Sequence, residues 1–226
     1  IVSLKTSNKY FGPQEIFGGI NENENGLDLI REINNKDIKL IKEIHLNKNE
    51  YDELPESLKS SIYWFLCGVA TMRYWKYNKP VSMLIHTSQN QKNHDNIFIL
   101  IDKWLKNMTK DELLMETGKL WKKETNRFSK DHFYTQIPNY RSINDEEIRD
   151  YPKFEDIRDE ILKIKERTTH IVLNQDQDLI YDEKGGVHIC IDNCSKNKTE
   201  DGFHMRLAYP NKNDSINETT PAFIVI

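Results

Sequence analysis

The sequence predicts an α/β fold in which helices cover a buried sheet. Three observations indicate this class. Val81 to Ile85 read as a mainly apolar strand with no polar face, which is typical of a covered parallel sheet. A strongly apolar helical pattern precedes this strand, and an amphipathic one follows it. Short runs rich in β-forming residues come after residue 168, beyond a long helical section.

The predicted strand starts and ends sharply. Pro80 blocks a helix at its start, and Lys79 before it is pushed towards an extended conformation. Thr87 and Ser88 at the other end are good helix-capping residues, and Gln91 stands three residues after Ser88, the spacing of a capping box. We therefore expect a strand, a polar turn and a helix from about Gln89 to Met108.

A second helix is expected in front of this strand. It starts at Pro55 and repeats apolar residues at helical spacing through Met72, so it should be buried on most faces. It ends in Arg73 to Tyr77, a basic and aromatic cluster. Such a cluster can stack nucleic-acid bases, but a helix end that emerges from the core is the commoner explanation.

The rest of the chain is expected to add helices and then strands. Thr109 and Glu112 have capping-box spacing and open a helix to about Arg127, and Pro152 opens another. The expected strands cover 170–174, 179–181, 187–191, 206–209 and 223–226, and the alternation in 187–191 suggests that this strand is half-exposed. Two short helical patterns, 27–33 and 37–44, precede all of these elements.

These elements suggest a division of the chain. Residues 1–54 are expected to be an N-terminal connecting segment, and 55–226 a single domain. Within it, 55–108 would form a helix–strand–helix core, 109–168 a helical insertion, and 169–226 the remaining strands. The chain starts with Ile1 and ends in an apolar run, so we expect a piece of a larger protein, truncated at the C-terminus.

Composition narrows the function only slightly. The 226 residues include 32 basic and 36 acidic side chains, for a net charge of −4, so charge alone does not indicate nucleic acid. Three cysteines do not make an even disulfide framework, which favours a reducing, cytoplasmic setting. The longest apolar run, 62–72, is shorter than the roughly 20 residues that cross a bilayer, so we expect no membrane partner.

Most motifs that could indicate a metal site or a catalytic residue have simpler structural explanations. His188, Cys190 and Cys194 invite a metal interpretation, but their spacing is not a common zinc pattern and a fourth ligand is missing, so no metal site is predicted. The chain has neither a phosphate-binding P-loop motif nor a dinucleotide-binding glycine motif. Cys67 lies inside the apolar helix and is expected in the core.

The polar tip after Val81–Ile85 is the best candidate site, because ligands of open α/β sheets bind outside the carboxyl ends of strands. Thr87 and Ser88 could simply cap the next helix, or they could also contact a phosphate together with the N–H groups of the helix start. His86 and His94 flank this tip. A histidine at a strand end is more often a structural hydrogen-bond donor than a catalyst.

One family resemblance adds to these inferences. The segment from Pro55 to His94 resembles the Z-one domain, a family described as an endonuclease domain and found attached to helicase-like ATPases. The matching residues are Pro55-Glu56-Ser57-Leu58, then Ser82-Met83-Leu84-Ile85-His86-Thr87-Ser88, then His94. Tyr10-Phe11-Gly12-Pro13 and Ala222-Phe223-Ile224-Val225-Ile226 also look like parts of that family.

The resemblance implies an incomplete RecA-like sheet, similar to the second lobe of superfamily-two helicases, with a helical insertion. It implies a parent protein that is a DNA-acting helicase-like ATPase or an endonuclease, of the kind used in bacterial restriction or phage defence. ATP and magnesium would belong to that parent, and no cofactor is expected in this piece. His86, Thr87, Ser88 and His94 would form its nucleic-acid-facing surface, and no catalytic residue is assigned.

Two other functions stay open at this point. The chain could be a protein-interaction or regulatory module that makes no nucleic-acid contact. It could also be a self-contained metal nuclease, although the acidic residues Glu22, Glu24, Glu50 and Asp52 look like a solvated surface rather than a metal-binding cluster.

Overall fold

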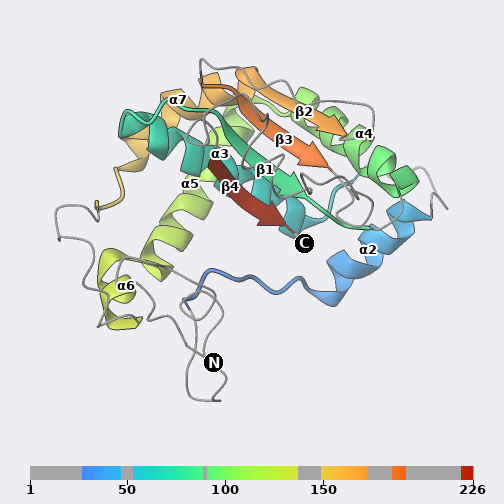
Figure 1. The fold of residues 1–226 in the computed structure, drawn as a ribbon, viewed down its shortest axis with the longest axis horizontal. Helices are drawn as coiled ribbons and strands as arrows, with labels where there is room; N and C mark the ends of the chain where they lie inside the picture. The colour runs from blue at the N-terminus through green and yellow to red at the C-terminus, as the bar shows by residue number, and fades with distance from the viewer. Residues whose placement is uncertain are drawn as a thin grey trace, which may run out of the picture. The chain divides into compact units, whose positions relative to one another are not determined.

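The computed structural model describes residues 27–46, 53–88, 91–136, 149–172, 185–191 and 220–225 (Figure 1). Within these ranges, helices predominate up to residue 167 and strands follow. In chain order they are α2 (Asn35–His45), α3 (Glu56–Tyr74), β1 (Val81–Ile85), α4 (Gln91–Asn107), α5 (Lys110–Arg127), α6 (Lys130–Gln136), α7 (Phe154–Arg167), β2 (Thr168–Val172), β3 (Val187–Ile191) and β4 (Thr220–Val225).

The four strands form one parallel sheet in the order β2-β3-β1-β4. β1 is therefore an interior strand, with β3 on one side and β4 on the other (Figure 1). All five of its residues are buried, from Val81 to Ile85. This confirms the predicted α/β class and the predicted buried strand at 81–85.

β3 corrects one expectation. Residues 187–191 do form a strand, but all five are buried, so the strand is not half-exposed. The alternation of His188 with apolar neighbours suggested that one face of the strand is exposed to solvent. Pairing with both β2 and β1 places the strand inside the sheet instead, and His188 is only 4 % exposed.

The two outer strands of the sheet are shifted from their predicted bounds. β2 begins at Thr168, directly after α7, two residues earlier than expected. β4 begins at Thr220 and includes Pro221, beside which the pairing with β1 slips between Ser82 and Met83. Proline removes a ladder donor, which is tolerated on an outer strand. The predicted strands 179–181 and 206–209 lie outside the described residues.

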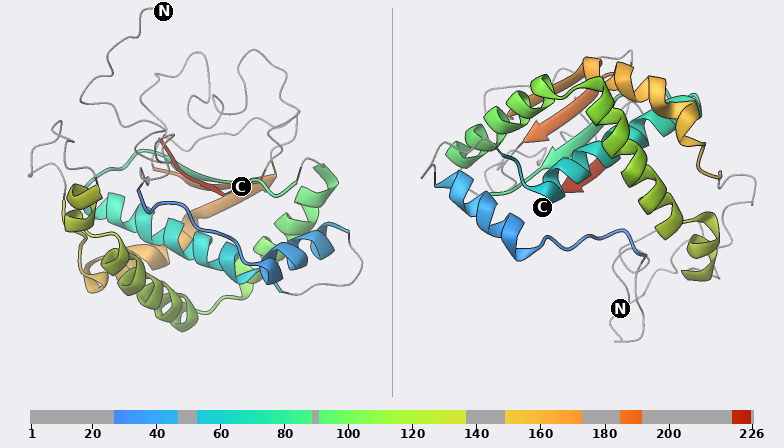
Figure 2. Two further views of the ribbon diagram at one scale, coloured as in Figure 1. Left: turned by 90° about the horizontal axis from the view of Figure 1, so that it is seen from below. Right: turned by 180° about the vertical axis from the view of Figure 1, so that it is seen from behind.

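α3, α4 and α7 lie on one face of this sheet (Figure 2). α3 contacts α7 and β4, and α4 contacts β2. α3 follows the predicted bounds closely and buries nine side chains, as expected for a helix that is apolar on most faces: Leu58, Ile62, Tyr63, Phe65, Leu66, Cys67, Val69, Ala70 and Thr71. α5 begins as predicted, where the Thr109 hydroxyl accepts from the Glu112 N–H.

Arg73, at the basic end of α3, binds the backbone of two neighbouring segments. The Arg73 guanidinium donates to the carbonyl oxygens of Tyr77, Lys79 and Gly185. Gly185 has a φ of 87°, and a Cβ there would lie 2.8 Å from the carbonyl oxygen of Asn78, so glycine is required. These bonds favour the helix-end interpretation of this cluster over base stacking.

The pattern over 27–33 does not form a helix, which is a correction, whereas 37–44 falls within α2. The Arg31 guanidinium donates to the Asp28 carbonyl oxygen and to Glu124, and Arg127 pairs with the Asp28 carboxylate. These bonds hold the segment in a turn. A helix as short as this one would not by itself offset the unfavourable free energy of helix nucleation.

By its contacts the chain divides into two units. One contains 1–32 with 121–152, and its described part includes those ion pairs and the edge-on contact of Trp121 with Tyr151. The other contains 33–120 with 153–226 and therefore the whole sheet. These boundaries differ from the sequence division at 54, 108 and 168, because α7 and the start of α5 pack with the sheet unit, for example where Gly118 meets Phe154.

The first turn of α3 is capped from another helix. Pro55 precedes it and makes no side-chain cap. The Asp37 carboxylate from α2 accepts a hydrogen bond from the Ser57 N–H instead, at 2.8 Å, and Asp37 is 2 % exposed. Asn34 in turn caps α2 by accepting from the Asp37 N–H. Asp37 thus ties α2 to α3.

Replacing Asp37 with alanine should lower the free energy of unfolding by about 1 kcal/mol, the usual value of a helix cap. Burial alone would raise the pKa of Asp37, but hydrogen bonds from Ser57 and Asn34 outweigh it and hold the pKa below the ordinary 3.8. The stabilisation is therefore present above pH 3.8 and is lost as pH falls through the lower pKa of the folded state.

Urea titrations at neutral and acidic pH measure this effect. Asp159→Ala is the control, because its side chain is 84 % exposed on α7. Equal losses in the two variants at neutral pH would contradict the capping role of Asp37.

Candidate functional site

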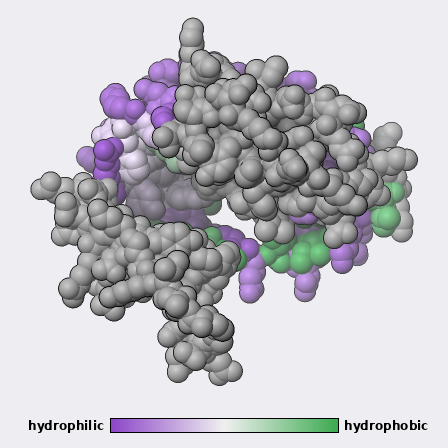
Figure 3. All heavy atoms as spheres, viewed as in Figure 1, coloured by the Kyte–Doolittle hydropathy of each residue, from purple (hydrophilic) through white to green (hydrophobic). Residues whose placement is uncertain are grey.

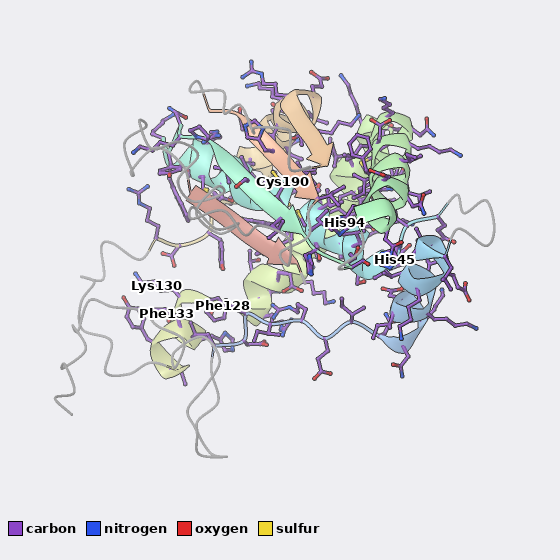
Figure 4. All side chains as sticks on the ribbon, turned by 45° about the vertical axis from the view of Figure 1, so that its right-hand side comes forward. His45, His94, Phe128, Lys130, Phe133 and Cys190 are labelled. Atoms are coloured by element: carbon purple, nitrogen blue, oxygen red, sulfur yellow. The ribbon has the colours of Figure 1, made fainter. Side chains whose placement is uncertain are left out.

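The carboxyl end of β1 meets two helices. Residues His86, Thr87 and Ser88 follow the strand and are partly exposed. His45 stands in the last turn of α2, and His94 lies near the start of α4. Figure 4 shows His45 and His94 on the side of the sheet where β1 ends, while Cys190 lies within the sheet. We call residues 86–88 the strand tip.

Ser88 is held by two side chains of α4. Asn93 Nδ2 donates to Ser88 Oγ at 2.8 Å. His94 Nε2 donates to the Ser88 carbonyl oxygen, also at 2.8 Å. α4 begins at Gln91, two residues later than expected, so Ser88 does not directly precede the helix. The tip is thus fixed to α4 through side chains of its first turns.

Thr87 is held by α2. His45 Nε2 lies 3.1 Å from Thr87 Oγ1, a hydrogen bond between residues that are 42 positions apart. Asn96 Nδ2 of α4 also donates to the carbonyl oxygen of Ile44 at 3.2 Å, which satisfies one of the last carbonyls of α2. α2, α4 and the strand tip therefore form one hydrogen-bonded assembly.

Burial keeps two of the three histidines here neutral at ordinary pH. It lowers the pKa of His45 below 6.5, and the nearby His94 lowers it further. Burial also lowers the pKa of His94; the hydrogen bond to Ser88 and the charge of Asp95 oppose this shift, and His86 adds to it. The rings of His86 and His94 are edge to face, with centroids 6.1 Å apart.

The ring of His94 has a defined proton position. A carbonyl oxygen can only accept, so Nε2 carries the proton and Nδ1 of the neutral ring is an acceptor. His94 is fully buried, and within the described ranges its Nδ1 has no hydrogen-bond partner. His94 thus acts as a positioning residue for Ser88, not as a group that faces solvent.

The structure brings all four predicted site residues together, at and beside the strand tip. Thr87 and Ser88 present hydroxyl groups, and His94 orients the turn. Sequence reasoning missed His45, Asn93 and Asn96. Asn93 could have been found from its place near the start of the expected helix, whereas no local signal connects His45 to a turn 42 residues later.

Other candidate chemistry is weaker. Among the described residues, no group of three histidine, cysteine or acidic side chains could hold a metal ion. His188 and Cys190 are both buried in β3, and Cys194 lies outside the described ranges. Burial raises the pKa of Cys67 to about 12, consistent with the expected core thiol rather than a nucleophile. In the part of the chain that is described, no helix has the length and apolarity to cross a membrane.

The lowered histidine pKa values predict a pH-dependent stability. The unfolded chain binds these protons more readily, so the free energy of unfolding should fall as pH drops below 6.5. His94→Gln removes one titrating group and keeps an amide donor for Ser88. Its loss of stability on acidification should be smaller, by up to about 1.4 kcal/mol per pH unit.

Urea titrations across this pH range provide the measurement, with His132→Gln as the control because His132 is exposed on α6. The same pH slope in His94→Gln and wild type would contradict a buried neutral His94.

Comparison with known proteins identifies one family. No curated protein and no solved structure matches this chain. The profile of the Z1 domain, the Z-one family named above, matches residues 57–199, which is more than half of the chain. The match includes α3, β1, α4 and the strand tip. The chain belongs to the Z1 domain family.

Proposed function

We propose that this chain is a nucleic-acid-facing lobe of a DNA-acting, helicase-like ATPase of the kind that serves bacterial restriction or phage defence. The strand tip would contact the phosphate backbone, with Thr87 and Ser88 as the contacting groups. The observation that carries the proposal is the position of the Thr87 hydroxyl: at the carboxyl end of an interior parallel strand, partly exposed, and oriented by a second element.

The sheet supports this location. In open α/β sheets, ligands bind outside the carboxyl ends of the strands, and β1 is flanked by parallel neighbours on both sides. α4 begins at Gln91, three residues after Ser88, and its Asn93 side chain contacts the Ser88 hydroxyl, so a phosphate bound at the tip would be favoured by the positive dipole end of this helix. Hydroxyls and helix starts are among the groups that bind phosphates without reading sequence.

The resemblance to superfamily-two helicases supports a RecA-like lobe. On that analogy, β1 is the strand that opens the second lobe, and its polar tip approaches the nucleic-acid backbone. The chain has no P-loop motif, so ATP and magnesium would bind elsewhere in the parent protein. No nucleotide hydrolysis and no DNA cleavage is assigned to the residues of this chain.

A direct binding experiment tests the proposal. The affinity of the 226-residue chain for a labelled single strand and for the matching duplex is measured over a series of salt concentrations. Phosphate contacts should make the logarithm of affinity fall linearly with the logarithm of salt, with a slope of about −0.7 per contact for a single strand and about −0.9 for a duplex.

Thr87→Val keeps the side-chain shape and removes the hydroxyl. A hydrogen bond to a charged group contributes about 1.5–3 kcal/mol, so the affinity should fall roughly tenfold or more. Thr135→Val on α6 is the control, since Thr135 is an exposed threonine outside the tip.

Wild-type protein that shows no salt-dependent binding would overturn the proposal and favour a protein-interaction or regulatory module. Salt-dependent binding that is equally strong in Thr87→Val would move the interface away from the tip.

A further inference from the structure

α2 carries an exposed basic ridge that the proposed interface does not use. Lys36, Lys39 and Lys42 are all exposed and recur every third residue, and His45 continues the series. Residues three apart are neighbours on a helix surface, and such a row forms one continuous ridge. From Lys36 to His45 the ridge rises about 13 Å along the helix axis and winds by about half a turn around it.

The acidic residues of α2 do little to neutralise this ridge. Asp37 is buried and its carboxylate accepts from the Ser57 N–H, so it faces α3 rather than solvent. Glu43 Oε1 lies 3.9 Å from Lys39 Nζ, and the Lys39 side chain is 80 % exposed. An ion pair that is this long and this exposed neutralises little of the lysine charge. On the face drawn in Figure 3, hydrophilic and hydrophobic residues lie side by side over the region of α2. Leu46, directly after the helix, is 60 % exposed.

The ridge ends at the strand tip. His45 is its last member, and His45 Nε2 contacts Thr87 Oγ1 at 3.1 Å. Asn96 fixes the end of α2 to α4 by donating to the Ile44 carbonyl oxygen. The exposed lysines and the Thr87 hydroxyl, which is the proposed phosphate contact, therefore belong to one hydrogen-bonded assembly. In a duplex, a 13 Å rise covers about four successive phosphates of one strand.

We propose that α2 is the second half of the nucleic-acid interface, with Lys36, Lys39 and Lys42 binding backbone phosphates along the ridge that leads to the strand tip and His45 orienting the Thr87 hydroxyl. This inference rests on the function proposed above and adds a binding helix and a positioning residue to it. The occupant we commit to is a nucleic-acid backbone, because its regularly spaced phosphates match the row of exposed lysines and the adjoining hydroxyl.

Protonation of His45 should change how the Thr87 hydroxyl binds a phosphate. The neutral ring can either donate to Thr87 or accept from it, but the protonated ring can only donate. Protonation therefore leaves the Thr87 hydrogen available to a phosphate and adds a positive charge beside it. His94 of α4 is the titratable group that acts on His45; His86 from the strand tip and Asp95 from α4 act on His94. Lys42 and Glu43 are the charged neighbours on α2 itself.

Salt-dependent DNA affinity tests the lysine ridge. The triple variant Lys36→Gln, Lys39→Gln, Lys42→Gln should lower the magnitude of the salt slope by about two for a single strand and nearly three for a duplex. The matched control neutralises three lysines elsewhere in the sheet unit, Lys110, Lys119 and Lys163, whose side chains are 74 %, 63 % and 61 % exposed. The control should keep the wild-type slope.

The two proposals can fail separately. Suppose that wild type binds DNA with a salt-dependent affinity. If the α2 variant then keeps the wild-type salt slope, or if the control variant loses as much of the slope as the α2 variant does, α2 is not part of the interface and only the strand tip remains as the proposed contact. If wild type shows no salt-dependent binding, the proposed function itself fails and this inference with it.

The pH profile tests His45. Wild-type affinity should rise as pH falls below neutrality, by up to about tenfold for each unit by which bound DNA raises the pKa of His45. His45→Gln keeps a donor for Thr87, so it should retain binding at alkaline pH but lose this rise. His45→Leu removes the donor and should bind more weakly than His45→Gln at every pH. A wild-type profile that His45→Gln leaves unchanged would overturn the role of His45.

Discussion

The burial of β1 is the constraint on which the rest of the structure depends. Its backbone pairs with β3 and β4, and its side chains from Val81 to Ile85 are removed from water. A strand enclosed in this way needs polar groups where it emerges, because its next backbone groups can no longer pair within the sheet. At this end His94 Nε2 pairs with the Ser88 carbonyl oxygen, and the polar residues His86, Thr87 and Ser88 follow the buried strand, so the end of the strand is a polar tip at a defined place.

Neighbouring helices fix the geometry of that tip. α4 holds Ser88 through Asn93 and His94, and α2 holds Thr87 through His45. Asp37 and Asn96 tie α2 to α3 and α4 in turn. A substitution at either end of α2 should therefore act on both stability and the tip. Burial lowers the pKa values of His45 and His94, so protonation of either ring would change the contacts that it makes in this assembly.

The sequence predicts elements with strong local signals and misses what depends on long-range pairing. The apolar run 81–85, the apolar helix after Pro55 and the Thr109 cap were all predictable, since each depends on near neighbours. The burial of β3 was not, because the strand order that encloses His188 is a property of the whole sheet. The Arg31 and Asp28 ion pairs that replace a helix at 27–33 involve partners almost a hundred positions away. The contact of His45 with Thr87 could not be predicted for the same reason, so the four site residues could be named from the sequence, but not the helix that orients Thr87.

Mapping bound DNA onto the backbone amides by NMR tests the central claim most directly. A short DNA strand is titrated into isotope-labelled protein, and the shift of each amide signal is followed. We predict the largest shifts at Thr87, Ser88 and the exposed face of α2, with small shifts in α7. Saturable DNA binding that shifts amide signals elsewhere, but not those of the strand tip and α2, would contradict the assignment of the DNA interface to the strand tip and α2.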